Sequence, residues 1–219
     1  GKALVEHQVQ RLQAGGIDNL LLVGSSENLQ GIQDRLPDVQ IVEQTEDPGT
    51  MHGALLSALP HCGDDPVLIV GGNDVVDPAA YKDVRQAVEG GQGGGALLAQ
   101  RVQRYFPGGY LQLDGDRITG IAEKPGPGNE PSDLVTIVVH GHTSASALLT
   151  VLQGDIDRGR DDGYEQALGR LFAREQYCAI PYEGQWQAVK YPWHLLPLLN
   201  LLLQEYEEPF IHPEASIHP

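Results

Sequence analysis

The sequence is short of basic residues and of cysteine, and each shortage excludes a class of protein. Its 14 lysines and arginines stand against 30 aspartates and glutamates, which gives a formal net charge of −16. A surface this negative repels a phosphate backbone, so we expect no nucleic-acid partner. The two cysteines, Cys62 and Cys178, are too few for a disulfide framework and indicate a reducing, cytoplasmic location.

Long apolar runs are also missing. The most apolar stretch, residues 195–203, contains Asn200 and has about half the length of a membrane-spanning helix. No signal-peptide pattern opens the sequence, so we expect a soluble, cytoplasmic protein without a membrane partner. The 27 glycines and 15 prolines among 219 residues fall below the roughly 25–30% share that is typical of low-complexity chains.

In the first ninety residues, segments with helical spacing of apolar residues alternate with short apolar runs. The expected helices begin at Leu4, after a cap at Ser26, at Gly53 and at Pro78. The apolar runs occupy residues 20–23, 39–42 and 67–70. Runs without alternation are typical of strands buried on both faces. Strands and helices in this order predict a parallel sheet that is covered on both faces.

After Gly95 the pattern changes to strands that connect directly. A glycine-containing turn at residues 114–116 joins two extended segments into a β-hairpin. Further strands are expected at residues 96–100 and 134–139, and helices at 145–152, 164–175 and 193–207. The predicted fold class is therefore α/β, with a mixed sheet and helices on both faces.

The last residues repeat Ile-His-Pro with a period of six, at Ile211 and Ile217. An aliphatic residue at a six-residue period is typical of a left-handed parallel β-helix, which needs at least three stacked repeats to be stable. A polar tail that repeats by coincidence is the alternative. The sequence thus predicts one domain over residues 1–208 and the beginning of a hexapeptide-repeat β-helix over 209–219.

Five short motifs occur in order along almost the whole chain. They are Gly1-Lys2-Ala3-Leu4-Val5-Glu6-His7, Glu43-Gln44 with Gly49-Thr50-Met51-His52-Gly53-Ala54, Val67-Leu68-Ile69-Val70-Gly71-Gly72-Asn73-Asp74, Ile121-Ala122-Glu123-Lys124-Pro125 and Tyr191-Pro192-Trp193-His194-Leu195-Leu196. Together they resemble the sugar-1-phosphate nucleotidylyltransferases, the enzymes that make nucleotide sugars. The resemblance implies a Rossmann-like, GT-A-like nucleotidyltransferase domain. It also implies a nucleoside triphosphate and a sugar 1-phosphate as substrates, Mg²⁺ as cofactor, and a possible homo-oligomer formed through the β-helix.

The resemblance places Gln44, Gly49 and Thr50 in a nucleotide-binding loop. A glutamine amide can both donate and accept a hydrogen bond, which suits the imide of uracil or thymine and favours UTP or dTTP. Gly49 would let the backbone approach the base closely. A solvated glutamine at the end of a strand is the alternative for Gln44.

Asp74 follows a run of small residues at the end of a strand, where open α/β sheets bind their ligands. The resemblance makes it both a catalytic residue and a magnesium ligand. A gapless comparison places Asn73 opposite the aspartate of the family, so Asn73 is the alternative metal ligand. A purely structural turn or helix cap is the other interpretation of Asp74.

The resemblance assigns the sugar phosphate to the residues around the hairpin. Glu123 would accept hydrogen bonds from sugar hydroxyls, and Lys124 would neutralise the phosphate as a catalytic point charge. Gly109 and Thr136 are the other sugar-binding candidates. An exposed ion pair is the alternative for Glu123 and Lys124, and a plain turn glycine is the alternative for Gly109.

Three departures from the family pattern favour a second hypothesis. The glycine-rich phosphate loop and its lysine precede the first motif in the family, so we expect an upstream segment that also carries the first strand. Thr136 replaces the sugar-binding asparagine, and Ala188 replaces the second metal ligand, with Lys190 nearby. The alternative function is a catalytically degenerate homologue that binds nucleotide or sugar nucleotide, or that serves in assembly or regulation.

His140 and His142 lie on one face of a predicted strand. Two imidazoles on the same face could bind zinc. A hydrogen-bonded or exposed pair is the interpretation we favour.

Overall fold

The computed structural model describes residues 2–47, 49–91, 93–154, 162–204 and 214–216. The β-helix predicted for residues 209–219 falls, apart from 214–216, outside the described residues and stays a prediction. Within the described ranges, no helix is long and apolar enough to cross a membrane.

The elements alternate between helix and strand in the first half of the chain and become strand-rich in the second half. The α-helices are α1 (Leu4–Ala14), α2 (Leu29–Arg35), α3 (Met51–Ala58), α4 (Pro78–Gly90), α5 (Ala145–Leu152), α6 (Gly163–Arg174) and α7 (Leu195–Leu203). The strands are β1 (Leu21–Gly24), β2 (Gln40–Glu43), β3 (Val67–Val70), β4 (Asp74–Val75), β5 (Gly95–Arg101), β6 (Gly109–Asp114), β7 (Arg117–Glu123), β8 (Leu134–His142), β9 (Tyr177–Pro181) and β10 (Gln187–Ala188).

A six-stranded mixed sheet with the order β3-β8-β5-β9-β7-β6 forms the centre of the molecule. β8 runs antiparallel to both β3 and β5, and β5 runs parallel to β9. Strands β3, β5 and β9 therefore point the same way and end at the same edge. β1 and β2 form a separate parallel pair, and β4 and β10 a short antiparallel pair.

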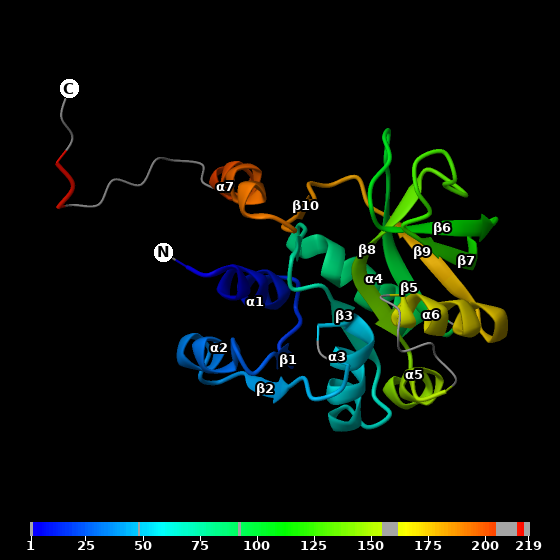
Figure 1. The fold of residues 1–219 in the computed structure, drawn as a ribbon, viewed down its shortest axis with the longest axis horizontal. Helices are drawn as coiled ribbons and strands as arrows, with labels where there is room; N and C mark the ends of the chain where they lie inside the picture. Colours follow the sequence, from blue (N-terminus) through cyan, green and yellow to red (C-terminus); the bar gives the residue numbers. More distant parts are fainter. Residues whose placement is uncertain (1, 48, 92, 155–161, 205–213, 217–219) are drawn as a thin grey trace.

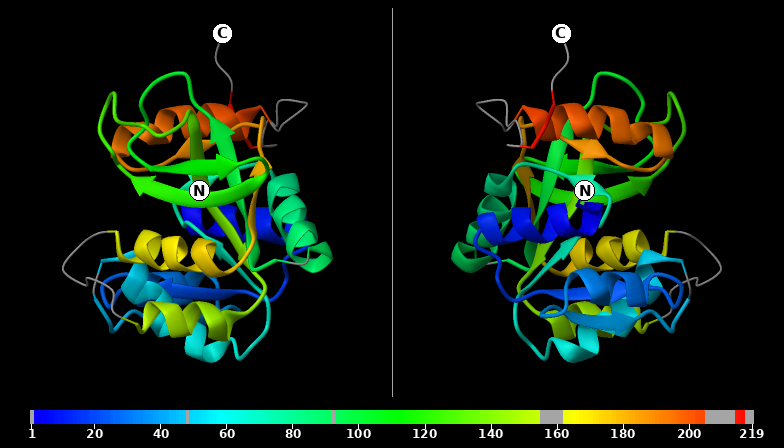
Figure 2. Two further views of the ribbon diagram at one scale, coloured as in Figure 1. Left: turned by 90° about the vertical axis from the view of Figure 1, so that its right-hand side faces the viewer. Right: turned by 90° about the vertical axis from the view of Figure 1, so that its left-hand side faces the viewer.

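Helices cover both faces of the sheet (Figure 1). Side chains of α3, α5 and α6 pack on one face, and those of α1 and α4 pack on the other. α7 packs on β4, on β10 and on the start of α1, through a small cluster around Leu198 and Leu201. The β6–β7 hairpin and α7 lie at one end of the molecule, and α2, α3 and α5 lie at the other (Figure 2).

The predicted α/β class with a mixed sheet and helices on both faces is confirmed. Three predicted helix starts are wrong. α3 begins at Met51, two residues before the predicted Gly53, because Thr50 caps it. The cap of α2 is Asn28 and not Ser26, because residues 25–28 form a turn in which the Ser25 carbonyl accepts the Asn28 amide. The last predicted helix starts two residues late, at Leu195, because Pro192 opens a short 3-10 turn before it.

The apolar runs that form β1 and β3 are strands, and both faces of β3 are covered, since Val67 and Ile69 pack on one core cluster and Leu68 and Val70 on the other, but their burial is only partial. All four residues of β3 and the first three of β1 are only partly buried. Within the described residues, β1 pairs with β2 alone and β3 with β8 alone, so one edge of each strand has no partner strand. These side chains are accordingly only partly buried.

A chain of hydrogen-bonded side chains runs through the core beneath α6. His142 Nδ1 lies 2.8 Å from the Tyr177 hydroxyl and its Nε2 lies 3.0 Å from the Tyr164 hydroxyl. The Tyr164 hydroxyl lies 3.0 Å from His140 Nδ1, and His140 Nε2 lies 2.8 Å from Thr136 Oγ1. The prediction that His140 and His142 form a hydrogen-bonded pair of structural residues agrees with these contacts.

A bulge in β8 makes the contact between Thr136 and His140 possible. Between the pairs Leu97↔His140 and Ala99↔Thr136, β5 advances two residues while β8 advances four. In a regular strand, residues four apart lie about 13 Å apart. Because the insertion is of two residues, the alternation of side chains is kept, and both side chains still face α6.

The two buried histidines predict a loss of stability in mild acid. Burial lowers the pKa of His140 and of His142 to about 3. The unfolded chain therefore takes up more protons below pH 6.5, and the stability that is complete above pH 6.5 is lost as the pH falls towards 3. By pH 5 we expect a loss of about 2 kcal/mol for each histidine.

Urea unfolding at pH 7.5, 6 and 5 measures this loss, in a range where ordinary carboxylates keep their charge. An unfolding free energy that stays constant from pH 7.5 to 5 would contradict the burial of neutral imidazoles.

Candidate active site

The carboxyl ends of β3, β5 and β9 meet at one edge of the sheet, and each leads into a segment with polar or aromatic side chains. β3 leads to the turn Gly71–Asp74, β5 to the loop that contains Phe106, and β9 to the segment that contains Trp186 and Lys190. Open α/β sheets bind ligands outside the carboxyl ends of their strands. This edge is therefore the candidate active site.

Asp74 and Asn73 direct side-chain oxygens towards the same space above Gly71. A Cβ atom placed on Gly71 would lie 2.9 Å from Asp74 Oδ2 and 3.5 Å from Asn73 Oδ1. Val138 Cβ would lie 3.1 Å from the same point, so these atoms leave no room for a side chain at position 71. The two alternative metal ligands predicted from the sequence thus lie together, and a carboxylate with an amide oxygen is a donor set that suits Mg²⁺.

The Asp74 carboxyl is held in place by its surroundings. The Trp186 indole N–H donates to Asp74 Oδ1 at 2.9 Å, and the side chain is almost fully buried. Burial raises the pKa of Asp74, while the Trp186 hydrogen bond, the charge of Lys190 and the backbone of Val138 act to lower it. The short β4–β10 pairing places Ala188, which has no side-chain donor, directly opposite Asp74.

Lys190 is fixed beside Asp74 by the loop that follows β5. Its ammonium donates to the Pro107 carbonyl at 2.9 Å and lies 4.7 Å from the centre of the Phe106 ring. The Phe106 ring in turn lies 4.6 Å from the Trp186 ring. One compact cluster therefore brings a buried carboxyl and a cation to the same edge.

Glu123 and Lys124 lie at the end of β7, where the same loop reaches them. The Lys124 amide donates to the Gly108 carbonyl, and Glu123 pairs with Gly109 in the hairpin register. Lys124 Nζ lies 3.2 Å from Glu123 Oε1, and the backbone of Lys124 has a φ of 43°. A non-glycine residue held at positive φ costs free energy, and such strain clusters at functional sites.

Gly109 and Thr136 adjoin this group, although protein contacts already account for them. A Cβ on Gly109 would lie 2.8 Å from Ile121 Cδ1 and 3.2 Å from Thr136 Cγ2. The Thr136 hydroxyl donates to the Leu98 carbonyl at 3.1 Å and contacts His140. Thr136 therefore faces Gly109 with its methyl group, and its role in sugar binding stays a prediction.

The predicted nucleotide loop forms one compact turn between β2 and α3. Gln44 Nε2 donates to the carbonyls of Asp47 and Thr50, at 2.9 Å each. Thr50 caps α3, since its hydroxyl accepts from the Gly53 amide at 3.0 Å. Gly49 has a φ of 83° and open space where a side chain would lie. Both Gln44 and Thr50 thus shape the loop, whether or not they also touch a base.

Sequence reasoning missed two members of the site. Trp186, the partner of Asp74, stands in a stretch of mixed composition and belongs to none of the five motifs. Gln8 binds the backbone of the Asp74 turn from α1. It interrupts the apolar stripe Leu4-Gln8-Leu12, and that interruption was the available signal. Among the described residues, no three His, Cys, Asp or Glu side chains form a metal cluster.

Comparison with known proteins decides the family. The model of the MobA-like NTP transferase domain matches residues 1–214. The chain belongs to this family. The resemblance that the five sequence motifs carried is thereby confirmed.

This chain is similar in sequence to the bifunctional sugar-1-phosphate nucleotidylyltransferase/acetyltransferase of Sulfurisphaera tokodaii. It is 24% identical over 196 residues, which are 89% of this chain and 46% of that protein. The chain thus spans less than half the length of this relative.

Solved structures with low sequence identity share the fold. A putative glucose-1-phosphate thymidylyltransferase from Bacillus anthracis, in complex with sucrose, aligns with a TM-score of 0.78 at 16% identity, over 94% of this chain and 85% of that one. A UDP-glucose pyrophosphorylase with bound UDP-glucose aligns with a TM-score of 0.76 at 15% identity, over 94% and 88%. UTP-bound UGPase from Acinetobacter baumannii gives 0.74 at 17% identity, over 94% and 84%.

Proposed function

We propose that this protein transfers a nucleotidyl group from a nucleoside triphosphate to a sugar 1-phosphate. An oxygen of the sugar phosphate attacks the α-phosphorus, the bond from that phosphorus to the bridging oxygen breaks, and pyrophosphate leaves. Such a reaction needs positioning and charge neutralisation more than covalent help. The observation that carries the proposal is the grouping of Asp74, Asn73 and Lys190 at the carboxyl ends of β3 and β9, together with the loop after β5, which contacts Lys190 through Pro107 and Lys124 through Gly108.

Asp74 and Asn73 are the proposed magnesium ligands. Mg²⁺ in phosphoryl-transfer sites is held by one or two carboxylates together with substrate phosphates and water, so the absence of a donor at Ala188 is compatible with binding. The ion would neutralise and orient the triphosphate. Trp186 keeps the carboxylate turned towards the space above Gly71.

Lys124 and Lys190 are proposed to neutralise the rest of the negative charge of the substrates. Lys124 is proposed to bind the phosphate of the sugar 1-phosphate, with Glu123 accepting hydrogen bonds from the sugar hydroxyls. Lys190, fixed by Pro107 and Phe106, adds a positive charge on the Asp74 side. It partly compensates for the missing second carboxylate at position 188.

UTP or dTTP is the proposed donor. Gln44 holds the loop carbonyls through its Nε2, which leaves Oε1 as the atom that would accept the imide N–H of uracil or thymine. The open space at Gly49 would admit the edge of a base. The solved relatives with UTP and UDP-glucose support a pyrimidine nucleotide by likeness of fold only.

A strand between β1 and β3 is part of the same proposal. α3 contacts β1, and its leucines also pack with Val67 and Ile69 of β3, so the two free edges lie under one helix. A segment preceding Gly1 would supply this central strand and a phosphate-binding loop at its carboxyl end. The partly buried side chains of β1 and β3 would then become more fully buried.

Pyrophosphate release by the full-length protein tests the function. Each common nucleoside triphosphate is paired with a panel of sugar 1-phosphates, with and without Mg²⁺. We expect release with UTP or dTTP, with one class of sugar phosphate, and only with the metal. Release with GTP or ATP alone would contradict the assignment of Gln44. Binding of nucleotide without release from any pair would identify the degenerate homologue.

A further inference from the structure

One side chain of α1, that of Gln8, forms hydrogen bonds with the backbone of the turn that carries Asn73 and Asp74. Gln8 Nε2 donates to the Asp74 carbonyl at 2.8 Å and to the Gly71 carbonyl at 3.1 Å. The same turn is closed by a hydrogen bond from the Asp74 amide to the Gly71 carbonyl. The amide of Gln8 therefore joins the two ends of the four-residue turn.

Gln8 is itself fixed and almost completely buried. The Tyr81 hydroxyl of α4 donates to Gln8 Oε1 at 3.3 Å, and Gln8 is only 4% exposed. A buried glutamine costs free energy that an apolar residue would avoid. It stands between Leu4 and Leu12 on one stripe of the helix, so packing alone would favour a leucine here.

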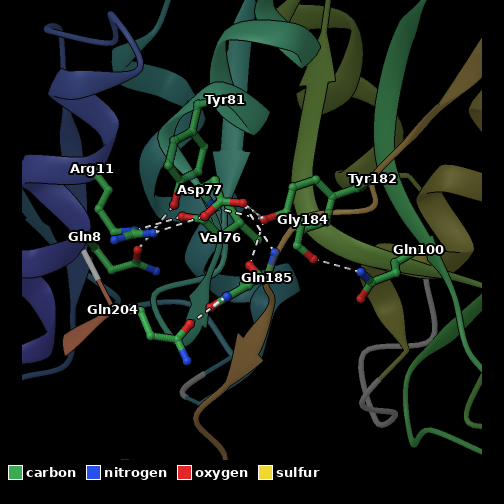
Figure 3. Close-up of polar contacts among 10 residues, drawn as sticks. All are labelled: Gln8, Arg11, Val76, Asp77, Tyr81, Gln100, Tyr182, Gly184, Gln185 and Gln204. Carbon is green, nitrogen blue, oxygen red and sulfur yellow. Dashed lines mark hydrogen bonds and ion pairs between the residues drawn. The ribbon is translucent and has the colours of Figure 1, made fainter. Parts of the chain in front are cut away.

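Arg11, one turn further along α1, contacts the next two residues of the same segment, Val76 and Asp77. Its Nε donates to the Val76 carbonyl at 2.8 Å, and its guanidinium lies 3.7 Å from the Asp77 carboxylate. The Tyr182 hydroxyl donates to Asp77 Oδ2 at 2.8 Å from the other side (Figure 3). The far end of the segment is thus anchored separately. Backbone hydrogen bonds also hold the turn, since the Val189 amide donates to the Asn73 carbonyl and the Gly71 amide to the Val138 carbonyl, at 2.8 Å each. Gln8 adds a side chain that joins the two ends of the turn.

We infer that Gln8 is a positioning residue for the metal site: its amide fixes the backbone of the turn so that Asp74 and Asn73 face the space above Gly71 together. The inference rests on the proposed function, in which these two side chains hold Mg²⁺. The groups that orient metal ligands typically contribute 10- to 100-fold to metal affinity or activity.

The experiment measures Mn²⁺ binding as well as turnover, in the full-length protein. Trp186 contacts Asp74, so quenching of its fluorescence reports on the site, and a Trp193→Phe background removes the other tryptophan. Gln8→Met keeps the length of the side chain and removes both hydrogen bonds to the turn. Gln13→Met, at an exposed position of the same helix, is the matched control.

We expect Gln8→Met to weaken Mn²⁺ binding and to lower kcat by about 10- to 100-fold each, with little change in the KM for the sugar phosphate. Gln13→Met should match the parent protein. Tyr81→Phe, which removes only the hydroxyl that holds Gln8, should weaken binding by about 3- to 10-fold. In the double variant it should add nothing to Gln8→Met, because it acts through the same side chain.

A melting temperature that falls in Gln8→Met while Mn²⁺ affinity and kcat stay at the parent values would overturn the inference and leave only a structural role. If Gln8→Met does not fold, Tyr81→Phe decides, and parent-like binding in that variant would overturn the inference. The variant Asp74→Asn distinguishes a failure of this inference from a failure of the proposed function. If it abolishes binding while Gln8→Met does not, the inference fails and the proposed function stands. If Asp74→Asn binds Mn²⁺ like the parent, the proposed metal site fails.

Discussion

Asp74→Asn is expected to lower the turnover by about 10²- to 10³-fold without loss of stability. Asparagine has nearly the same shape, and its Oδ1 still accepts the Trp186 hydrogen bond. What it loses is the negative charge that would bind the metal. The variant is measured by steady-state pyrophosphate release and by thermal unfolding.

The stability of this variant follows from the direction of the pKa shift. Burial raises the pKa of Asp74, so the ionised carboxyl costs stability at neutral pH, and asparagine removes that cost. The melting temperature should change little, because the cost of the buried charge is removed while the hydrogen bond from the Val138 backbone to the carboxyl is weakened. Asp83→Asn, at an exposed position of α4, is the control and should leave turnover unchanged. A stable Asp74→Asn variant with parent-like turnover would refute the role of this carboxylate.

The second large effect is expected at Lys124, where two substitutions should differ in stability but not in activity. Both Lys124→Ala and Lys124→Gly remove the charge that we assign to the sugar phosphate, and we expect turnover to fall by about 10²-fold or more. Only glycine also relieves the positive φ of 43°. Relief of a left-handed conformation is worth about 1–2 kcal/mol, offset in part by the entropy of glycine in the unfolded chain.

The glycine variant should therefore be more stable than the alanine variant by up to about 1 kcal/mol, while both are equally inactive. Lost contact with Glu123 contributes little to either, because Lys124 is about half exposed. Lys82→Ala, at an exposed site on α4, controls for the loss of a surface charge. Equal turnover in Lys124→Ala and in the parent would remove Lys124 from the site.

The elements that the sequence predicts well are those whose apolar spacing matches their burial. Residues 67–70 and 145–152 form β3 and α5 with the predicted bounds. A short apolar run is typical of a buried strand, and apolar residues at helical spacing are typical of a helix that packs on a sheet. The cap of α2 could not be chosen among Ser26 and Asn28, since both residue types cap helices equally well. The partial burial of β1 and β3 depends on which strands lie beside them, and no local pattern encodes that.

Site residues that lie in a sequence motif could be predicted, whereas residues that join the site only through tertiary contacts could not. Asn73, Asp74, Glu123 and Lys124 stand in motifs with a known order. Trp186 reaches Asp74 from more than a hundred residues away, and no spacing rule predicts that contact. The bulge in β8, which brings Thr136 against His140, is likewise not marked by any turn residue between the two.

Transfer of the α-phosphate tests the central claim most directly. The full-length protein is incubated with Mg²⁺, the preferred sugar 1-phosphate and its nucleoside triphosphate labelled at either the α- or the γ-phosphorus. The account predicts that the α-label appears in a nucleotide sugar and the γ-label in pyrophosphate, in equal amounts, and that Asp74→Asn loses both together. A γ-label found on the sugar, or an α-label that stays in free nucleotide while pyrophosphate accumulates, would contradict nucleotidyl transfer.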